Sequence, residues 1–283
     1  MDINRRNLDM VAQLVERDIK ENNLPATVFR TTNQREAIRG AKYVFSVVRV
    51  GGLEAFETDI DIPLKYGVDQ CVGDTLAPGG LMYAQRTIPV MLDICKDIRE
   101  VGAPGAIFIN HSNPMAMNTW ACNKYGGVKT IGLCHGVTGG KNLIAKALNI
   151  PVNEIDFVCA GINHQTWYIQ IKHKGIDLTG KLLAAMEADP VIREREKVRI
   201  DVLRRFGYFS TESNGHLSEY VPWYRKRPAE IKNWISLDSW ILGETGGYLR
   251  VCREGRNWFQ SDFKNWLSEK APAICPEKRG FEH

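Results

Sequence analysis

Short apolar runs alternate with longer amphipathic segments through the first 160 residues of the chain. Apolar side chains at helical spacing predict helices over 4–22, 81–101, 115–124 and 139–148. Runs of mostly apolar residues between them predict strands over 41–48, 106–109, 130–133 and 156–160, the first of them buried. The stretch from Gly51 to Gly80 is rich in glycine and polar residues, which indicates loops. Such alternation of strand and helix is typical of a parallel sheet with helices on both faces.

The pattern changes after His164. Residues 167–172 alternate like an antiparallel strand and reach a turn at Lys174-Gly175. Helices are predicted near 179–188, 191–206 and 258–270. We therefore predict an α/β protein with two domains. Residues 1–150 would form a Rossmann-like doubly wound parallel sheet without its first strand, and residues 151–283 a partial α+β catalytic domain.

Reactive side chains follow three of the predicted strands. Asn110 to Met115 follow the second strand, Cys134-His135 the third, and Asn163-His164 the fourth. Open α/β sheets bind ligands at the carboxyl ends of their strands. Because thiolate and imidazole bind first-row metals, these positions predict a site for a metal or a sugar.

Composition excludes several classes of function. The 283 residues are 44% hydrophobic and 25% charged, with a formal net charge of +4. This net charge is small for the length of the chain, and the sequence contains no dense basic run. We therefore expect no nucleic-acid partner. No apolar run approaches the roughly 18 residues of a membrane span, and the start lacks a signal-peptide core, so no membrane association is expected. Seven scattered cysteines without a CxxC pair indicate a reducing, cytoplasmic location.

The first residues look like the end of a strand that leads into a helix. In dinucleotide-binding folds, an acidic residue about 20 residues beyond a GxGxxG loop binds the cofactor ribose. Asp2 has this placement, although no such loop precedes it in this sequence. Its other interpretation is a cap for the following helix.

Taken together, an ordered set of motifs resembles family 4 of the glycoside hydrolases, which use NAD and manganese. The motifs are Gly73-Asp74-Thr75 with Pro78-Gly79-Gly80, Asn113-Pro114-Met115, Gly132-Leu133-Cys134-His135 and Gly161-Ile162-Asn163-His164. Within the family, the Cys-His pair is similar to the α-galactosidase and α-galacturonidase branch, because the phospho-glycosidase branch has aspartate after the cysteine. Residues 211–223 and 243–248 look most like the α-galacturonidases.

The resemblance implies that Cys134 and His164 ligate a divalent metal, Mn²⁺ or another. Two protein ligands would leave coordination positions for sugar hydroxyls and water, as a catalytic metal requires. Each residue alone has a plainer interpretation, as a buried cysteine and as a core histidine bonded to backbone.

The resemblance also implies acid–base roles. His135 would protonate the leaving oxygen, since the pKa of imidazole lies near neutrality. Its alternative is a hydrogen-bonding neighbour of the metal site. Tyr220 is the nearest candidate for the base that removes the C2 proton, and His216 or Tyr224 are the alternatives.

Further side chains would recognise the sugar. We expect Asn113, Asn163 and Asp74 to bind it, although asparagine also favours turns. A uronate carboxylate would need an arginine, which could come from Arg86, Arg225 or Arg227.

The activity implied is hydrolysis of an α-galacturonide or α-galactoside, a small sugar or oligosaccharide. NAD would take a hydride from C3, the C2 proton would be removed, and the aglycone would leave C1 before water adds and the hydride returns. The resemblance also implies a homo-oligomer.

The resemblance covers almost the whole chain and implies further residues at both ends. About 30 residues with a strand and a glycine-rich loop would precede Met1, and helices would follow Arg279–Glu282. One alternative is an NAD-dependent 2-hydroxy acid dehydrogenase of the lactate or malate type, which shares the alternating pattern. The other is a truncated, non-catalytic remnant that cannot bind NAD.

Overall fold

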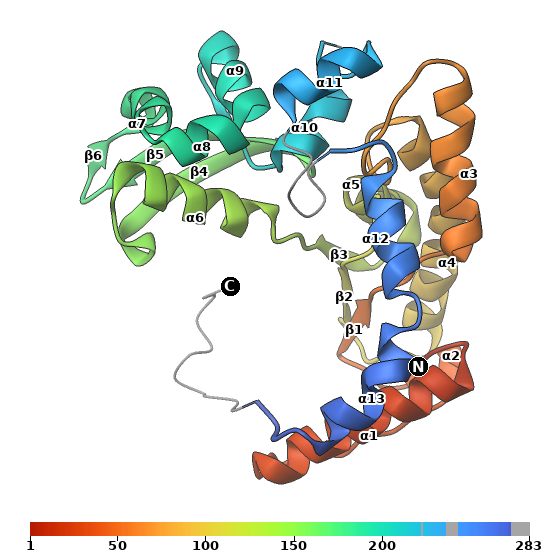
Figure 1. The fold of residues 1–283 in the computed structure, drawn as a ribbon. Coiled ribbons are helices and arrows are strands. Elements are labelled where there is room, and N and C mark those ends of the chain that lie inside the picture. The colour runs from red at the N-terminus through yellow and green to blue at the C-terminus, as the bar shows by residue number, and fades with distance from the viewer. Residues whose placement is uncertain (222, 236–242, 273–283) are drawn as a thin grey trace.

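The chain folds into two lobes (Figure 1). The computed structural model describes residues 1–221, 223–235 and 243–272. We call residues 1–133 with 243–272 the first lobe and residues 134–235 the second lobe. The stretch Arg279–Glu282, after which further helices are expected, lies outside the described residues.

A three-stranded parallel sheet forms the centre of the first lobe. Its strands are β1 (Tyr43–Ser46), β2 (Ile107–Asn110) and β3 (Lys129–Gly132), in that order. The long helix α4 (Pro78–Val101) covers one face, and its Met91 packs against Phe108 of β2 in a fully buried cluster. The parallel sheet expected from the alternating pattern is therefore confirmed for these three strands.

The opposite face of this sheet is open in the described residues. Tyr43 is 69% exposed, Phe45 58% and Ile131 41%. Phe45, Ile109 and Ile131 stand in one row across the three strands, because they are register partners. The prediction that 41–48 is a buried strand is therefore wrong, since only alternate residues of β1 face α4.

The first lobe contains four further helices before β3. They are α1 (Arg5–Glu21), α2 (Gln34–Ile38), α3 (Gly52–Lys65) and α5 (Met115–Ala121), which continues into the π-helical turn η1 (Cys122–Gly126). Asn4 caps α1, as its side chain accepts a hydrogen bond from the Asn7 backbone. The prediction of loops over Gly51–Gly80 is wrong for the part that forms α3. Phe56 and Ile60 lie one turn apart on the buried side of this helix. The glycine and polar signals that suggested a loop, at 73–75 and 78–80, lie after this helix, while Gly51 and Gly52, both with positive φ, stand at its start.

The second lobe contains an antiparallel sheet of β4 (Ile155–Ile162), β5 (Gln165–His173), β6 (Ile176–Asp177) and β7 (Phe209–Ser210). Strand β4 pairs with β5, and β5 also pairs with β6 and β7. The prediction that 156–160 belongs to the parallel sheet is therefore wrong. The tight turn at Asn163-His164 returns the chain directly, whereas a parallel neighbour needs a long crossover.

Helices pack on this sheet and beside it. Helix α6 (Gly136–Leu148) is followed by the short turn η2 (Val152–Glu154) before β4 begins. After β6 come η3 (Thr179–Lys181), α7 (Leu182–Ala188), α8 (Pro190–Arg195), α9 (Lys197–Phe206), α10 (Asn214–Tyr220) and α11 (Pro228–Trp234). Ile144 of α6 and Met186 of α7 meet Tyr168 of β5 in a fully buried cluster. The single helix expected over 191–206 is divided at Glu196, whose backbone is not helical.

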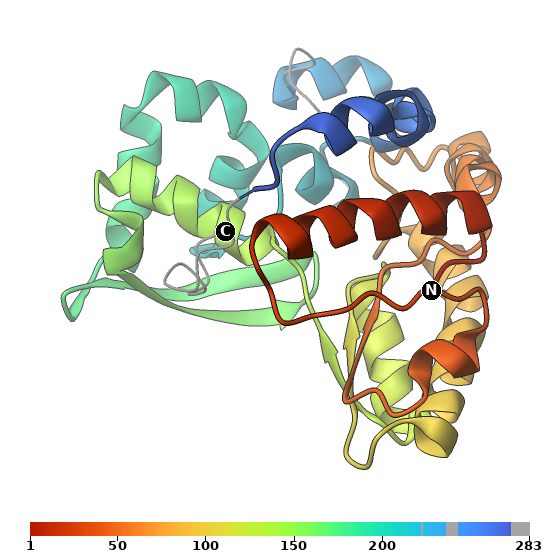
Figure 2. The same ribbon diagram turned by 90° about the horizontal axis from the view of Figure 1, so that it is seen from below.

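The last described helices return to the first lobe. Helix α12 (Gly247–Gly255) packs on α3, and α13 (Trp258–Ser268) packs along α1 (Figure 2). Arg17 of α1 donates a hydrogen bond to the Glu269 backbone carbonyl at 3.1 Å. Helix α6 lies before residue 150 in the sequence but packs in the second lobe. The domain boundary at residue 150 stays a prediction. Among the described helices, none is both long and apolar enough to cross a membrane.

Candidate active site

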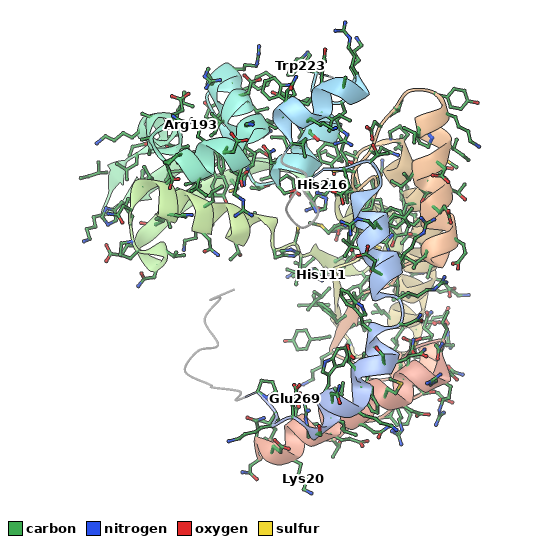
Figure 3. The ribbon with its side chains drawn as sticks, in the orientation of Figure 1. Lys20, His111, Arg193, His216, Trp223 and Glu269 are labelled. Carbon is green, nitrogen blue, oxygen red and sulfur yellow. The ribbon has the colours of Figure 1, made fainter. Side chains whose placement is uncertain are left out.

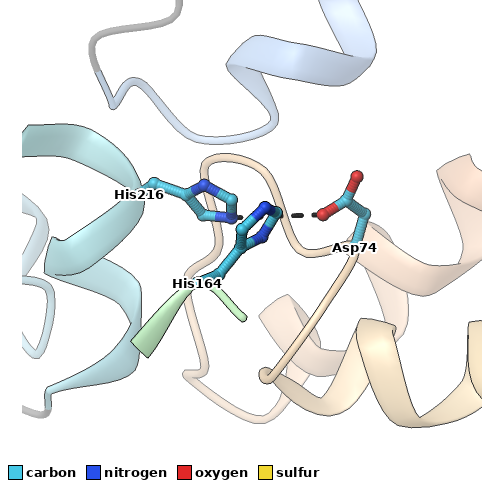
Figure 4. A group of neighbouring side chains, drawn as sticks. All are labelled: Asp74, His164 and His216. Atoms are coloured by element: carbon cyan, nitrogen blue, oxygen red, sulfur yellow. Dashed lines mark ion pairs between the residues drawn. The ribbon is translucent and has the colours of Figure 1, made fainter. Parts of the chain in front are cut away.

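Polar side chains from both lobes converge where the lobes meet, near the labelled His216 in Figure 3. Asp74 and Thr75 come from the loop before α4, and Cys134 follows β3. His164 occupies the turn between β4 and β5, and His216 lies on α10. Figure 4 shows Asp74, His164 and His216 side by side.

His164 is held in one orientation and one tautomer. Its φ of 66° is the left-handed conformation required by the β4–β5 turn, and its side chain is buried. The Thr75 hydroxyl donates to Asp74 Oδ1 at 2.7 Å and lies 2.8 Å from His164 Nδ1. Because this hydroxyl has only one hydrogen, it must accept from Nδ1–H. The lone pair of His164 is therefore on Nε2.

The free nitrogen of His164 faces Cys134. The distance from His164 Nε2 to Cys134 Sγ is 3.5 Å, and the Gly136 backbone donates to the same sulfur at 3.4 Å. Burial raises the pKa of the Cys134 thiol. A cation between the two atoms would favour the thiolate, which is the form that binds metal.

His216 is enclosed by acidic groups and a tyrosine. Its Nδ1 lies 2.8 Å from Glu212 Oε2, and its Nε2 lies 2.5 Å from the Tyr220 hydroxyl. Burial disfavours the imidazolium, but the hydrogen bond and charge of Glu212 outweigh it and raise the pKa of His216 to about 9. Burial also opposes the charge of Glu212, yet His216 lowers the pKa of that carboxyl to about 2. These two groups therefore form a buried ion pair near neutral pH.

Asp74 is buried, and its second oxygen faces the asparagine of the Asn-Pro-Met motif. Asn113 Nδ2 donates to Asp74 Oδ2 at 2.9 Å. Arg49 Nη2 lies 3.8 Å from the same oxygen, and the Arg49 guanidinium lies over the rings of Phe56 and Tyr83. Asp74 and Asn113, both expected to bind the sugar, are thus brought together beside a cation.

Other expected residues lie further out. His135 begins α6 and is exposed, with its ring centroid 6.4 Å from that of His111. The Asn163 side-chain oxygen is buried and has no hydrogen-bond partner among the described residues. Asp2 Oδ1 accepts a hydrogen bond from the Asn4 backbone at 2.7 Å, just before α1.

The candidates for the proton-abstracting base differ in position. Tyr220 belongs to the cluster, and burial followed by the charge of Glu219 raises its pKa well above the ordinary value. His216 is its hydrogen-bond partner. Tyr224 instead donates to Asp201 at 2.7 Å, inside the core of the second lobe.

The three arginines expected to bind a uronate already have partners. Arg86 pairs with Asp59, Arg225 pairs with Asp69 at 2.9 Å, and Arg227 pairs with Glu230 on the surface. None of these contacts involves a residue of the His164 cluster.

Several residues that shape the cluster were not assigned roles from the sequence. The side chain of Glu219 is fully buried and accepts hydrogen bonds from the backbone amides of Cys71, Val72 and Gly73, so α10 holds the loop that carries Asp74. Arg49 and Glu212 also emerge only from the structure. The one sequence signal for Glu212 is its place within residues 211–223, the segment that resembles the α-galacturonidases.

The described residues contain two groups able to hold a metal ion. They are Asp74 with His164 and His216, and Cys134 with His164 and Glu212, each with ligand atoms within 4.8 Å of one another. The thiolate and imidazole of the second group suit a first-row divalent ion. The residues present therefore fit the metal that the sequence motifs imply.

The chain matches known proteins along its length. Residues 1–150 match the sequence profile of the family 4 glycosyl hydrolases, and residues 159–283 match that of the family 4 glycosyl hydrolase C-terminal domain. An alpha-galactosidase of Rhizobium meliloti (strain 1021) is 55% identical over 283 residues, which is 100% of this chain and 58% of the relative. An alpha-galacturonidase of Thermoanaerobacterium saccharolyticum is 33% identical over 225 residues, 71% of this chain and 48% of the relative. The chain thus spans less than two thirds of the length of these curated relatives.

Solved structures show the same fold. A 6-phospho-beta glucosidase from Thermotoga maritima, solved with NAD and glucose-6-phosphate, has a TM-score of 0.71 at 23% identity, covering 99% of this chain and 61% of that one. A 6-phospho-alpha-glucosidase from gut microorganisms, solved with NAD and Mn²⁺, has a TM-score of 0.74 at 18% identity, covering 96% and 63%. The predicted α/β fold class is confirmed. With both profiles matched and this identity along its whole length, the chain belongs to family 4 of the glycosyl hydrolases.

Proposed function

We propose that the full-length protein hydrolyses α-galactosides or α-galacturonides, using NAD and a divalent metal such as Mn²⁺. The observation that carries the proposal is the convergence of Cys134 Sγ and His164 Nε2, 3.5 Å apart, beside Asp74 and Asn113. Relatives named alpha-galactosidase and alpha-galacturonidase support this substrate class.

Cys134 and His164 would hold the metal. Thr75 and Asp74 fix the imidazole so that Nε2 presents its lone pair, which is the usual way a neighbouring acceptor orients a histidine ligand. When bound, such an ion acts as a Lewis acid that polarises the oxygens of the sugar. The amide of Asn113 and the carboxylate of Asp74 would orient the sugar hydroxyls, and Asn163 would add its unpaired oxygen.

NAD would supply reversible hydride transfer at C3 of the sugar. Asp2 is the residue we propose for its ribose. One Asp2 oxygen accepts from the Asn4 backbone, which holds the carboxylate at the start of α1. The open face of the parallel sheet lies on the same lobe.

Proton transfers would fall to His135 and Tyr220. His135 is exposed at the start of α6, immediately after Cys134, and would protonate the leaving oxygen. Tyr220 would remove the C2 proton, and the His216 imidazolium beside its oxygen would favour the phenolate form. Burial raises the pKa of Tyr220, so this role requires the positive field of a nearby cation. His216 and Tyr224 are the alternatives, and the contact of Tyr224 with Asp201 makes it the weaker of the two.

The remaining expectations belong to the same proposal. The domain boundary near residue 150 and a homo-oligomeric assembly are retained from the sequence. A cytoplasmic location accords with the six described cysteines, all of which are free thiols.

The test is turnover of both substrate types by the full-length enzyme with NAD, Mn²⁺ and a reductant. We expect hydrolysis without accumulation of NADH, because the hydride returns to the same sugar. Cys134→Ser should abolish turnover, whereas Cys159→Ser, a thiol outside the cluster, should keep it. No hydrolysis of either substrate would refute the proposal.

The same assay separates the alternatives. A 2-hydroxy acid dehydrogenase would accumulate NADH with its substrate, and membership of a glycosyl hydrolase family makes this the weaker possibility. A non-catalytic remnant would show no NAD binding by the 283 residues themselves, so micromolar binding would exclude it.

A further inference from the structure

The two groups of potential metal ligands overlap at His164 but differ in how their atoms are used. In the first group, Asp74 Oδ1 accepts from Thr75 and Asp74 Oδ2 accepts from Asn113. His216 contacts Glu212 through Nδ1 and Tyr220 through Nε2. Every ligand atom that Asp74 and His216 could offer is therefore already engaged within the protein.

The ligand atoms of the second group are less engaged, although the Cys134 sulfur accepts a hydrogen bond from the Gly136 backbone at 3.4 Å. His164 Nε2 carries a lone pair, because Nδ1 is the protonated nitrogen. Cys134 Sγ lies 3.5 Å from it and Glu212 Oε1 lies 4.0 Å from it. In a tetrahedral site with bonds of about 2.3 Å to sulfur and 2.0–2.1 Å to nitrogen, the two ligand atoms stand about 3.6 Å apart. The spacing of Cys134 and His164 matches this value, and a small movement brings Glu212 Oε1 to the same distance.

Glu212 is built to present that oxygen. Its other oxygen, Oε2, is fixed by His216 Nδ1 at 2.8 Å, and its backbone amide donates to Ser210 Oγ at 3.3 Å. A Cβ atom at Gly136 would lie 2.8 Å from Glu212 Oε1 and 3.7 Å from Cys134 Sγ. The absence of a side chain at Gly136 therefore leaves the space in which the carboxylate and the thiol approach each other.

We propose that Glu212 Oε1 is a third protein ligand of the metal, so that the site is Cys134–His164–Glu212 rather than a cysteine and a histidine alone. The inference rests on the proposed function for the metal itself and adds the carboxylate. An oxygen ligand makes the site harder in the chemical sense, which suits Mn²⁺ better than sulfur and nitrogen alone. Coordination positions beyond these three ligands then remain for substrate oxygens and water.

The first experiment titrates the 283-residue chain with Co²⁺ and follows the absorption bands of the metal, then displaces Co²⁺ with Mn²⁺. We expect Glu212→Gln to weaken Co²⁺ binding by at least tenfold and to alter the d–d bands, while the thiolate charge-transfer band persists. Cys134→Ser should remove that charge-transfer band. Asp97→Asn, which changes a buried acid of the first lobe outside the cluster, should leave both the affinity and the d–d bands unchanged.

A second measurement does not depend on any variant. Crystals of the wild-type chain soaked in Mn²⁺ should show an anomalous peak about 2.0–2.2 Å from Glu212 Oε1, the range for a carboxylate ligand. A peak more than about 3 Å from that oxygen, unchanged affinity in Glu212→Gln, or an equal loss in Asp97→Asn would each overturn the proposal. So would a wild-type chain that binds neither metal.

Neither measurement uses a substrate, so the two proposals can fail separately. If Glu212 binds the metal but the full-length enzyme hydrolyses neither glycoside, the glycosidase proposal fails and the ligand assignment stands. If both glycosides are hydrolysed and Glu212→Gln binds metal like wild type, the ligand assignment fails and the glycosidase proposal stands.

Discussion

The two lobes contribute to the site in different ways. In the first lobe, two neighbouring parallel strands end just before Asn113 and just before Cys134, the first residue of the second lobe, and a general rule of α/β sheets places ligand-binding residues there. In the second lobe, His164 comes from a hairpin turn and His216 from a helix of seven residues. Their positions depend on individual contacts, such as the one between Glu219 and the loop at Cys71. One half of the site thus follows a rule of topology, and the other half follows from particular side chains.

The largest expected effect tests the sheet of the first lobe. Phe108→Ala removes a fully buried ring between the sheet and α4 and should lower the free energy of unfolding by about 3–5 kcal/mol. Phe45→Ala is the matched control on the opposite face, where the ring is 58% exposed, and should cost much less. Denaturant unfolding measures both variants. Equal losses would mean that the face bearing Phe45 is covered in solution.

The next effect tests the hydrogen bonds between Glu219 of the second lobe and the loop at Cys71 of the first lobe. Glu219→Gln keeps the volume of the side chain but places an amide against backbone donors, so at least one buried N–H loses its acceptor. The expected loss is about 1–3 kcal/mol in the free energy of unfolding. Glu230→Gln, which removes a surface partner of Arg227, should change stability by less than about 1 kcal/mol. If Glu219→Gln unfolds like wild type, the loop at Cys71 is held by other contacts.

A third variant tests how the first lobe orients a ligand in the second. Thr75→Val removes the hydroxyl that fixes the tautomer of His164, and loss of such a supporting partner typically costs about 10–100-fold in metal affinity. Thr75→Ser retains the hydroxyl and should restore most of the affinity. Co²⁺ titration gives both values. Equal affinity in the valine variant would show that Asp74 and Thr75 do not support the metal site.

The smallest expected effect concerns the helix that carries His216. Ser213 caps α10 by accepting a hydrogen bond from the His216 backbone at 3.3 Å, and Ser213→Ala should cost about 1 kcal/mol in the free energy of unfolding. Ser213→Asp preserves the cap and serves as the control. Thermal unfolding followed by circular dichroism is sufficient. A loss as large as that of Glu219→Gln would mean that the cap, rather than the buried glutamate, determines the position of α10.

The sequence alone determined the parallel strands, the long helices and the family to which the chain belongs. Apolar periodicity is a local property, and the motifs around Asp74, Asn113, Cys134 and His164 lie at fixed positions in the chain. It did not reveal α3, because the glycine and polar signals that follow this helix indicated a loop for the whole stretch. Nor did it reveal the antiparallel pairing of β4, because a buried strand has the same composition in either kind of sheet.

Only the tertiary structure decided which side chains face one another. Glu212 lies 4.0 Å from His164, although 48 positions separate them in the sequence, and Glu219 reaches amides 146–148 positions away. The three arginines suggested for a carboxylate proved to be paired elsewhere, while Arg49 lies next to Asp74. Periodicity identifies the face of an element that is buried, but the partner across that face is fixed only when hydrogen-bonding and packing requirements are met together.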